Sequence, residues 1–330
     1  MSRPRQLAVI ATSALALAAA LAASVAIGSV TLPLGDVLDA LKGANDAESH
    51  LIVRELRVPR TVAGLVAGAC LGVSGVLLQG ATRNPLASPA MLGITAGAGF
   101  AVVVTVALLG LPSGHAVWAA FGGGAAGFGI ALLLAGSGRD GLSPVRLALS
   151  GAIVSTMLAA WTTAILTLNE YAAEEVRDWL AGSLAGRDIT AVAPLLPLVA
   201  AALILAWALA RPLDALALGD EAAVGLGQRP GRVRLAAAVA ALALAAVAVA
   251  MAGPIAFVGL AVPHIARFLV GGGHRALLVA SVLLGPALLL VADVIGRIVA
   301  RPSEVQAGVI TALIGAPVLV RIVMNRKVAL

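Results

Sequence analysis

The chain has 330 residues, of which 61% are hydrophobic and 12% are charged, and its mean hydropathy is +1.04. Typical soluble domains have about 45–50% apolar and about 25% charged residues, so this composition excludes a water-soluble globular protein. The net charge of +6 does not indicate a nucleic-acid-binding protein, because only 3% of the residues are aromatic and the arginines stand singly between apolar runs.

Ten apolar runs follow one another along the chain, separated by charged or Pro/Gly-rich breaks. Since a spanning helix takes about 20 residues, these runs predict an all-α polytopic membrane protein with ten transmembrane helices. The predicted helices cover residues 7–28, 61–80, 91–110, 116–135, 147–168, 189–210, 235–252, 256–270, 276–295 and 306–324. Gly259 and Pro263 predict a break in the eighth. The first run is longer than the core of a cleavable signal peptide, which favours a retained helix.

The distribution of charge predicts how the chain lies in the membrane. Ten helices place both termini on the same side. If that side is the cytoplasm, most of the basic residues lie in cytoplasmic segments and most of the acidic residues lie outside, as the positive-inside rule requires. We therefore expect both termini to be cytoplasmic.

The first outer segment, residues 29–60, ends with three arginines on the side where the same rule disfavours them. These are Arg54, Arg57 and Arg60. One interpretation is contact with lipid headgroups or pairing with carboxylates of the same segment. Those carboxylates are Asp46, Glu48 and Glu55. The other interpretation is docking of an acidic partner from outside.

A second outer segment, residues 169–188, has the charge pattern of a short amphipathic helix lying at the membrane surface.

The longest cytoplasmic segment, residues 211–234, contains the pattern of a short capped helix. Gly219 permits a tight turn, Asp220 and Glu221 suit the first helical turn, and Gly227 can end the helix. Its apolar side consists of Ala222, Ala223 and Leu226.

Two patterns inside the predicted helices concern packing and charge. Gly64, Gly68 and Gly72 recur every four residues and predict a face that brings two helices close together. Asp293 is the one acidic candidate within a span, and Arg297 follows four residues later on the same helical face. We interpret them as a neutralised pair, with a proton relay as the alternative.

No motif for chemistry is visible. No glycine-rich turn leads into Lys-Ser or Lys-Thr, so the sequence has no P-loop for ATP. The four histidines lie far apart and no helix carries paired carboxylates, so we predict no metal site, no cofactor and no enzyme activity. If the chain transports, its energy comes from a separate protein, which could act on residues 211–234.

Several ordered motifs resemble those of the FecCD-type permeases of bacterial ABC importers for iron-siderophores, haem and cobalamin, over nearly the whole chain. The motifs are Arg57–Arg60, Gly75–Gly80, Arg83–Pro89, Leu218–Gly227, Gly253–Leu260 with Pro263 and His264, Asp293–Arg297, and Gly308–Pro317. The resemblance implies a type II importer permease fold, with residues 1–330 as one transmembrane domain. It also implies the bacterial plasma (inner) membrane as location.

The resemblance further implies partners. Two permease subunits, identical or different, would dimerise around a central pathway, bind two ATPase subunits and receive cargo from an extracytoplasmic binding protein. Arg57, Arg60 and, by position, Arg297 would accept carboxylates of the binding protein. The coupling helix inserted into the ATPase would comprise Gly219, Asp220, Glu221, Ala222, Gly225, Leu226 and Gly227.

The translocation pathway is predicted near the second helix and the break that follows it. The candidate residues are Gln79, Asn84, Pro85 and Pro89. An iron-siderophore is the expected cargo, with cobalamin or haem as alternatives. A ten-helix secondary carrier is the runner-up, but it should show an unpaired intramembrane charge.

The resemblance has one departure. The family usually reads Glu-Leu-Pro-x-Gly before the last helix, whereas this chain reads Glu304-Val305-Gln306-Ala307-Gly308. We therefore expect the start of the last helix to differ here.

Overall fold

The computed structural model describes residues 3–43, 48–111, 115–137, 144–186 and 189–324. This part of the chain is helical and contains no strand. The ten helices that correspond to the predicted spans are α1 (Arg3–Ala26), α4 (Val58–Thr82), α5 (Ile94–Ala107), α6 (Ala116–Gly136), α7 (Pro144–Leu168), α10 (Leu196–Ala217), α12 (Pro230–Ala252), α13 (Val258–Val270), α14 (His274–Val299) and α15 (Ala307–Met324). Seven helical stretches are long and apolar enough to cross a membrane, and α5, α13 and α15 supply shorter apolar helices.

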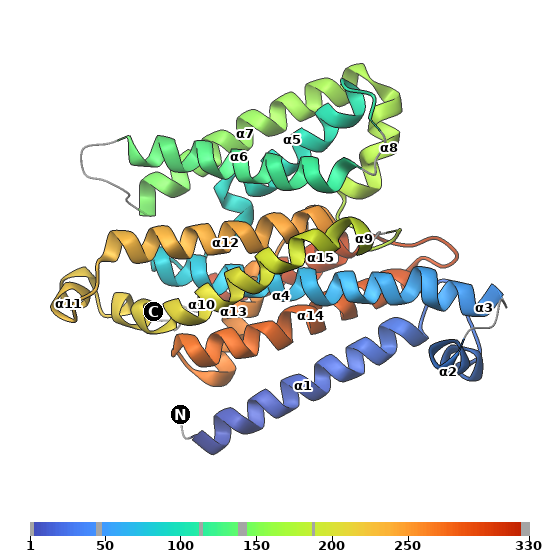
Figure 1. Ribbon diagram of the computed structural model, residues 1–330, viewed down its shortest axis with the longest axis horizontal. Coiled ribbons are helices and arrows are strands. Elements are labelled where there is room, and N and C mark those ends of the chain that lie inside the picture. Colours follow the sequence, from blue (N-terminus) through green and yellow to red (C-terminus); the bar gives the residue numbers. More distant parts are fainter. Residues whose placement is uncertain (1–2, 44–47, 112–114, 138–143, 187–188, 325–330) are drawn as a thin grey trace.

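Short helices lie at both ends of this bundle. They are α2 (Leu34–Lys42), α3 (Glu48–Leu51), η1 (Ile52–Arg57), η2 (Pro89–Leu92), α8 (Glu170–Leu180), α9 (Ile189–Val192), η4 (Ala193–Leu195) and α11 (Asp220–Gly225). Figure 1 shows α2, α3 and α8 at one end of the long helices, here called the α2 end, and α11 at the opposite end, here called the α11 end.

The centre of the bundle is formed by α4, α12 and α14. The α5, α6 and α7 helices form a layer on one side of α12, and α1 lies on the other side, against α14 (Figure 1). The central position explains why most of α4 and α12 is buried, while only 17% of the hydrophobic window of α1 and of α7 is buried.

The glycines of α4 allow this close packing, as the four-residue spacing predicts. A Cβ atom added at Gly68 would lie 2.5 Å from the Cα of Pro286 in α14, and one added at Gly72 would lie 2.8 Å from the carbonyl oxygen of Ser281. The two backbones therefore touch where a side chain would separate them.

The predicted boundary of the second span is wrong. Residues 48–82 form one continuous helical stretch, so Arg54, Arg57 and Arg60 lie on a helix and not in a loop. The stretch passes through a π turn, η1, immediately before Pro59. Proline lacks the N–H that an α-helix needs there, and the wider π turn accommodates that loss.

The predicted break in the eighth span is also misplaced. Pro263 lies inside α13, which is continuous from Val258 to Val270. The break precedes that helix, where Gly253 has a φ of 71° and Phe257 a φ of 68°. Gly75 and Gly259 instead let α4 approach α13, because a Cβ at Gly75 would collide with the Gly259 carbonyl group and one at Gly259 would lie 3.1 Å from the Leu71 carbonyl oxygen.

The cytoplasmic segment predicted at 211–234 is shorter than expected. The α10 helix continues to Ala217 in spite of Pro212, and α12 begins at Pro230. Residues 218–229 form the connection, and they contain α11. The second outer segment does contain the predicted amphipathic helix, α8, whose Ala172 N–H is capped by the side-chain oxygen of Asn169 at 3.0 Å.

Candidate functional site

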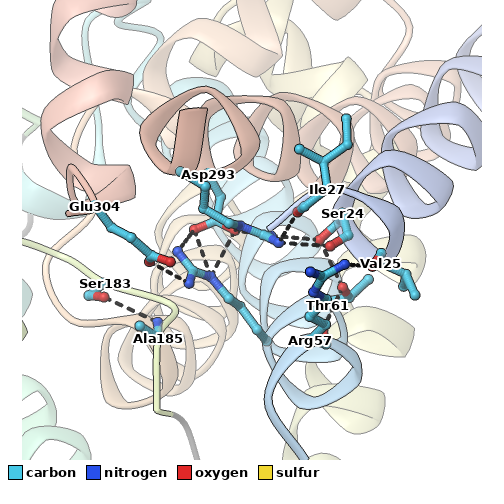
Figure 2. Close-up of polar contacts among 11 residues, drawn as sticks. Ser24, Val25, Ile27, Arg57, Thr61, Ser183, Ala185, Asp293 and Glu304 are labelled. Atoms are coloured by element: carbon cyan, nitrogen blue, oxygen red, sulfur yellow. Dashed lines mark hydrogen bonds and ion pairs between the residues drawn. The ribbon is translucent and has the colours of Figure 1, made fainter. Parts of the chain in front are cut away.

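A cluster of buried charges at the α2 end joins α4 to α14. Asp293 of α14 is fully buried and accepts hydrogen bonds from two arginines. Arg60 donates through Nε at 3.0 Å and through its terminal NH2 group at 2.7 Å, and Arg297 donates through Nε at 3.0 Å. Figure 2 shows this convergence on the Asp293 carboxylate. The predicted Asp293–Arg297 pair is therefore confirmed, and Arg60 is an additional partner.

The arginines of the cluster also cap the end of α1. The last carbonyl groups of a helix have no partner within it and carry partial negative charge, so cations stabilise them. Arg297 donates to the carbonyls of Ser24 (2.8 Å) and Ile27 (2.7 Å). Arg57 donates to the carbonyl of Val25 at 3.0 Å (Figure 2) and to that of Ala26 at 2.7 Å.

Glu304 completes the cluster from the loop that precedes α15. Its carboxylate accepts a hydrogen bond from Arg60 at 2.6 Å, and 28% of its side chain is exposed. Burial alone would raise the pKa of Glu304, but the hydrogen bond and the positive charge of Arg60 lower it below its ordinary value. In the same loop, Arg301 donates to the carbonyl oxygen of Gly28 at 2.8 Å.

The cluster lines a cavity of about 340 Å³ at the α2 end. Arg57, Arg60, Arg297 and Glu304 contribute its charged groups. The rest of the lining consists of residues 28–30 after α1, Ile52 and Leu56 of η1, and Ala185 and Gly186. Within the described residues, the arginines of the cluster outnumber its two carboxylates. The cavity is therefore electropositive, and an anionic group fits its charge.

These contacts show the partners of Arg57 and Arg60 within the chain, but they do not test docking of an outside protein. The partners of Arg57 and Arg60 are backbone carbonyls, Asp293 and Glu304, and not the predicted Glu48 or Glu55, while Asp46 lies outside the described residues. Only 4% of Arg57, 9% of Arg60 and 1% of Arg297 is exposed. Their docking role stays a prediction.

Sequence reasoning missed the links of Arg60 to Asp293 and Glu304. Arg60 is more than 230 positions away from both residues, so no local spacing connects it to them. The available signal was chemical. A buried aspartate with one arginine on its own helix retains capacity for a second donor, and the surplus arginines at the same end could supply it.

The second candidate site is α11, at the opposite end. Gly219 precedes the helix with a φ of +110°, and Gly227 follows it with a φ of +75°, as the capped-helix pattern predicts. Ala223 is buried, and the residues that face outward are Asp220, Glu221, Ala222, Val224, Gly225, Leu226 and Gly227. Leu218, Val224 and Leu226 are 59–69% exposed. Such exposed apolar residues on a charged helix are typical of a protein contact surface.

One side chain holds α11 against the bundle. Arg234 of α12 donates to the Asp220 carboxylate at 2.7 Å and to the carbonyl oxygen of Ala81 in α4 at 3.2 Å. The short helix is therefore fixed to two central helices.

The predicted pathway residues lie in different surroundings. Gln79 is buried, and its amide is 3.4 Å from the Leu260 carbonyl and from the guanidinium of Arg267. Pro89 is buried against Gly259, and Pro85 is half-buried. Asn84 lines a cavity of about 320 Å³ between the α4–α5 connection and the start of α7. The structure brings Asn84 to a cavity but packs Gln79 inside the bundle, and the pathway role of all four stays a prediction.

Comparison with known proteins agrees with this geometry. The family described as the FecCD transport family matches residues 16–325. The ferric enterobactin transport system permease protein FepD of Escherichia coli is 42% identical over 308 residues, which are 93% of this chain and 92% of FepD. The Fe(3+) dicitrate transport system permease protein FecD of Escherichia coli is 38% identical over 314 residues, 95% and 97% of the two chains.

A solved structure has the same fold. An inward-facing conformation of a metal-chelate type ABC transporter superposes with a TM-score of 0.83 at 26% identity, covering 96% of this chain and 98% of that chain.

Proposed function

This chain belongs to the FecCD transport family, and we propose that it is the permease subunit of a type II ABC importer that moves an iron-siderophore complex across the bacterial plasma membrane. Relatives named for ferric enterobactin and for Fe(3+) dicitrate, which cover nearly the whole chain, support the cargo class. Because the two relatives have similar sequence identity to this chain, the comparison does not favour one chelate over the other. Cobalamin or haem are the alternative cargoes.

The observation that carries the proposal is α11. A protein that only had to cross lipid would not keep Leu218, Val224 and Leu226 exposed on a helix outside the apolar spans. We assign this surface, residues 219–227, to contact with an ATPase subunit, which would supply the P-loop that this chain lacks. Two ATPase subunits and a second permease subunit, identical or different, complete the transporter.

The assignment of α11 fixes the orientation that we propose. The α11 end faces the cytoplasm, both termini are cytoplasmic, and the α2 end faces outward with lipid around the ten helices between them. This orientation agrees with the excess of basic residues in the segments at the α11 end.

The electropositive cavity at the α2 end is then open to an extracytoplasmic binding protein. We propose that acidic side chains of that protein approach Arg57, Arg60 and Arg297 there. Long-range attraction toward the cavity is screened over about 8–10 Å at physiological salt and affects the encounter rate, whereas direct bonds to these nearly buried arginines affect dissociation.

Transport itself requires no covalent chemistry in this chain. ATP binding closes the ATPase pair, the α11 helices follow that closure, and groups of helices rock around a pathway between the two permeases. Gln79, Asn84, Pro85 and Pro89 are the proposed pathway residues, and the cavity beside Asn84 supports a role for this region.

The first test addresses the ATPase contact. Val224→Glu and Leu226→Glu place a charge on the proposed surface, and we expect both variants to lose co-purification with the ATPase and uptake of iron-loaded siderophore. Leu38→Glu is the matched control, because Leu38 is also an exposed leucine on a short helix but lies at the α2 end. Unchanged ATPase association in the α11 variants would contradict the proposal.

The second test addresses the cargo. Cells that lack this chain are supplied with labelled iron-siderophore, cobalamin or haem, with and without the restored gene. Dependence of iron-siderophore uptake alone supports the proposed cargo. Dependence of cobalamin or haem uptake changes the cargo and keeps the importer, whereas uptake independent of any ATPase would indicate the secondary carrier.

A further inference from the structure

Glu304 and Asp293 contact the same arginine, but they hold it differently. Asp293 lies on α14, is fully buried, and binds the Nε and one terminal nitrogen of Arg60 together with Arg297. Glu304 lies in the loop before α15, binds the other terminal nitrogen of Arg60, and remains 28% exposed. Asp293 therefore holds one edge of the Arg60 guanidinium inside the protein. Glu304, which solvent can reach, occupies the other terminal nitrogen.

Among the described residues that line the electropositive cavity, Glu304 is also the one acidic residue. An incoming carboxylate that approached the outer nitrogen of Arg60 would meet the Glu304 carboxylate at the same donor. Two carboxylates this close repel each other, so the negative charge of Glu304 opposes the approach of a second carboxylate to this nitrogen.

We propose that Glu304 is an internal competitor for Arg60, which a carboxylate of the docking protein must displace before it can bind. This inference rests on the proposed function, because it assigns the regulation of the same docking cavity. Docking then exchanges an ion pair within the chain for one between two proteins, and Asp293 keeps Arg60 in place during the exchange.

The loop around Glu304 leads into α15 and is held by several bonds besides the one to Arg60. Arg301, before Glu304, is bonded to Gly28, and the Val305 N–H, after it, donates to the carbonyl of Gly296 at 3.0 Å. Gln306, where the related permeases usually have proline, donates to Asp178 of α8 at 3.0 Å. The loop is thus held on both sides of Glu304, and α15 begins three residues after it. Release of Glu304 removes the bond between this loop and α4.

The test compares two variants that carry the same change of net charge at the same end. Glu304→Gln removes the competing charge and keeps the side-chain size. Glu175→Gln is the matched control, because Glu175 is an exposed acid of α8 outside the cavity. The binding protein is titrated onto the whole transporter, permease with ATPase, in lipid nanodiscs.

We expect the Kd for the binding protein to fall by about three- to tenfold in Glu304→Gln, mainly through slower dissociation. In Glu175→Gln, we expect at most a small change in association rate, because this variant alters only the long-range field. Glu304→Ala should behave like Glu304→Gln, and it serves as the second neutral variant if the first does not fold.

The outcomes separate this inference from the function on which it rests. Equal Kd values in Glu304→Gln and Glu175→Gln, with weaker binding in Arg60→Gln, would overturn the role of Glu304 and leave docking at Arg60 intact. If Arg60→Gln binds as well as the unaltered transporter, the docking site itself is wrong and the inference fails with it.

Discussion

At the scale of single residues, the charges at the α2 end are arranged around Asp293. Its carboxylate is surrounded by protein and has two arginines as partners, so it neutralises cations that would otherwise be buried without compensation. A buried pair contributes little net stability over an apolar replacement, but removal of one partner leaves an uncompensated charge.

Asp293→Asn is therefore expected to destabilise the permease by about 3–5 kcal/mol. The single cysteine, Cys70, is buried in α4 and can report this change, because a thiol-reactive dye reaches it only after unfolding. Thermal unfolding of the detergent-solubilised protein should begin at a clearly lower temperature in Asp293→Asn. Asp39→Asn, at an exposed position of α2, is the control and should unfold like the original chain.

The bond between Glu304 and Arg60 should depend on pH in a defined direction. Because folding lowers the pKa of Glu304, the bond adds stability above the ordinary pKa of 4.5, and this contribution disappears as the pH falls through the lowered value. The difference in unfolding temperature between the original chain and Glu304→Gln should be constant near neutral pH and shrink below pH 4.5. A difference that grew on acidification would have the wrong sign.

At the scale of helices, the pattern of apolar runs and breaks located the seven long apolar stretches and the shorter helices α5, α13 and α15, because length and hydropathy decide which segments can cross lipid. The predicted boundaries were wrong where the same residues are compatible with two different backbone structures. Residues 29–60 were predicted as one outer segment before the second span, but a π turn, η1, joins α3 to α4 in one helical stretch. Pro263 predicted a break, but the chain breaks earlier, where Gly253 and Phe257 adopt left-handed backbone.

The contact between α4 and α14 gives a strong prediction for glycine. Gly68→Leu should destabilise the bundle by about 3 kcal/mol or more, because its Cβ atom alone would lie 2.5 Å from the backbone of Pro286. Gly129→Leu in α6 is the control, since no other atom lies within 4 Å of a Cβ at that position. The yield of monodisperse protein on size-exclusion chromatography should fall for the first variant and not for the second.

The attachment of α11 predicts a defect in transport without loss of the fold. Arg234→Ala removes the bonds to Asp220 and to Ala81, so α11 is no longer fixed to α4. We expect uptake of the cargo to fall several-fold while the ATPase still co-purifies, because the exposed Val224 and Leu226 remain. Equal loss of uptake and of ATPase association would indicate that Arg234 supports the contact surface itself.

At the scale of the whole molecule, the proposed orientation can be tested directly. Because Cys70 is buried, a new cysteine can be labelled against a low background. With a maleimide that does not cross membranes, Leu38→Cys at the α2 end should react in intact spheroplasts, and Val224→Cys at the α11 end should react only after permeabilisation. The reverse pattern would invert the proposed topology.

The sequence located the two candidate sites better than it described them. The residues that begin and end the capped helix at Gly219–Gly227 are close together in the sequence, so α11 could be predicted almost residue by residue. The α2 end could not, because its geometry depends on Arg60 meeting Asp293 and Glu304 across more than 230 residues. Arg57 and Arg60 bond to the end of α1 and to Asp293 of α14, since buried carbonyls and a buried carboxylate need donors, and these partners could not be read from the sequence.

The close packing of α4 and α14 has a mechanical consequence. The two helices are fastened at the α2 end by Arg60 and Asp293, in the middle by backbone contact at Gly68, and at the α11 end where Gly80 lies against the ring of His274. The 26 residues of α14 extend about 39 Å, so the helix pair runs across the bundle from the α2 end to the α11 end. His274 bonds to Asp214 of α10 at 2.7 Å, six residues before α11 begins. We therefore expect a displacement of this helix pair at the α2 end to reach the segment that leads into α11.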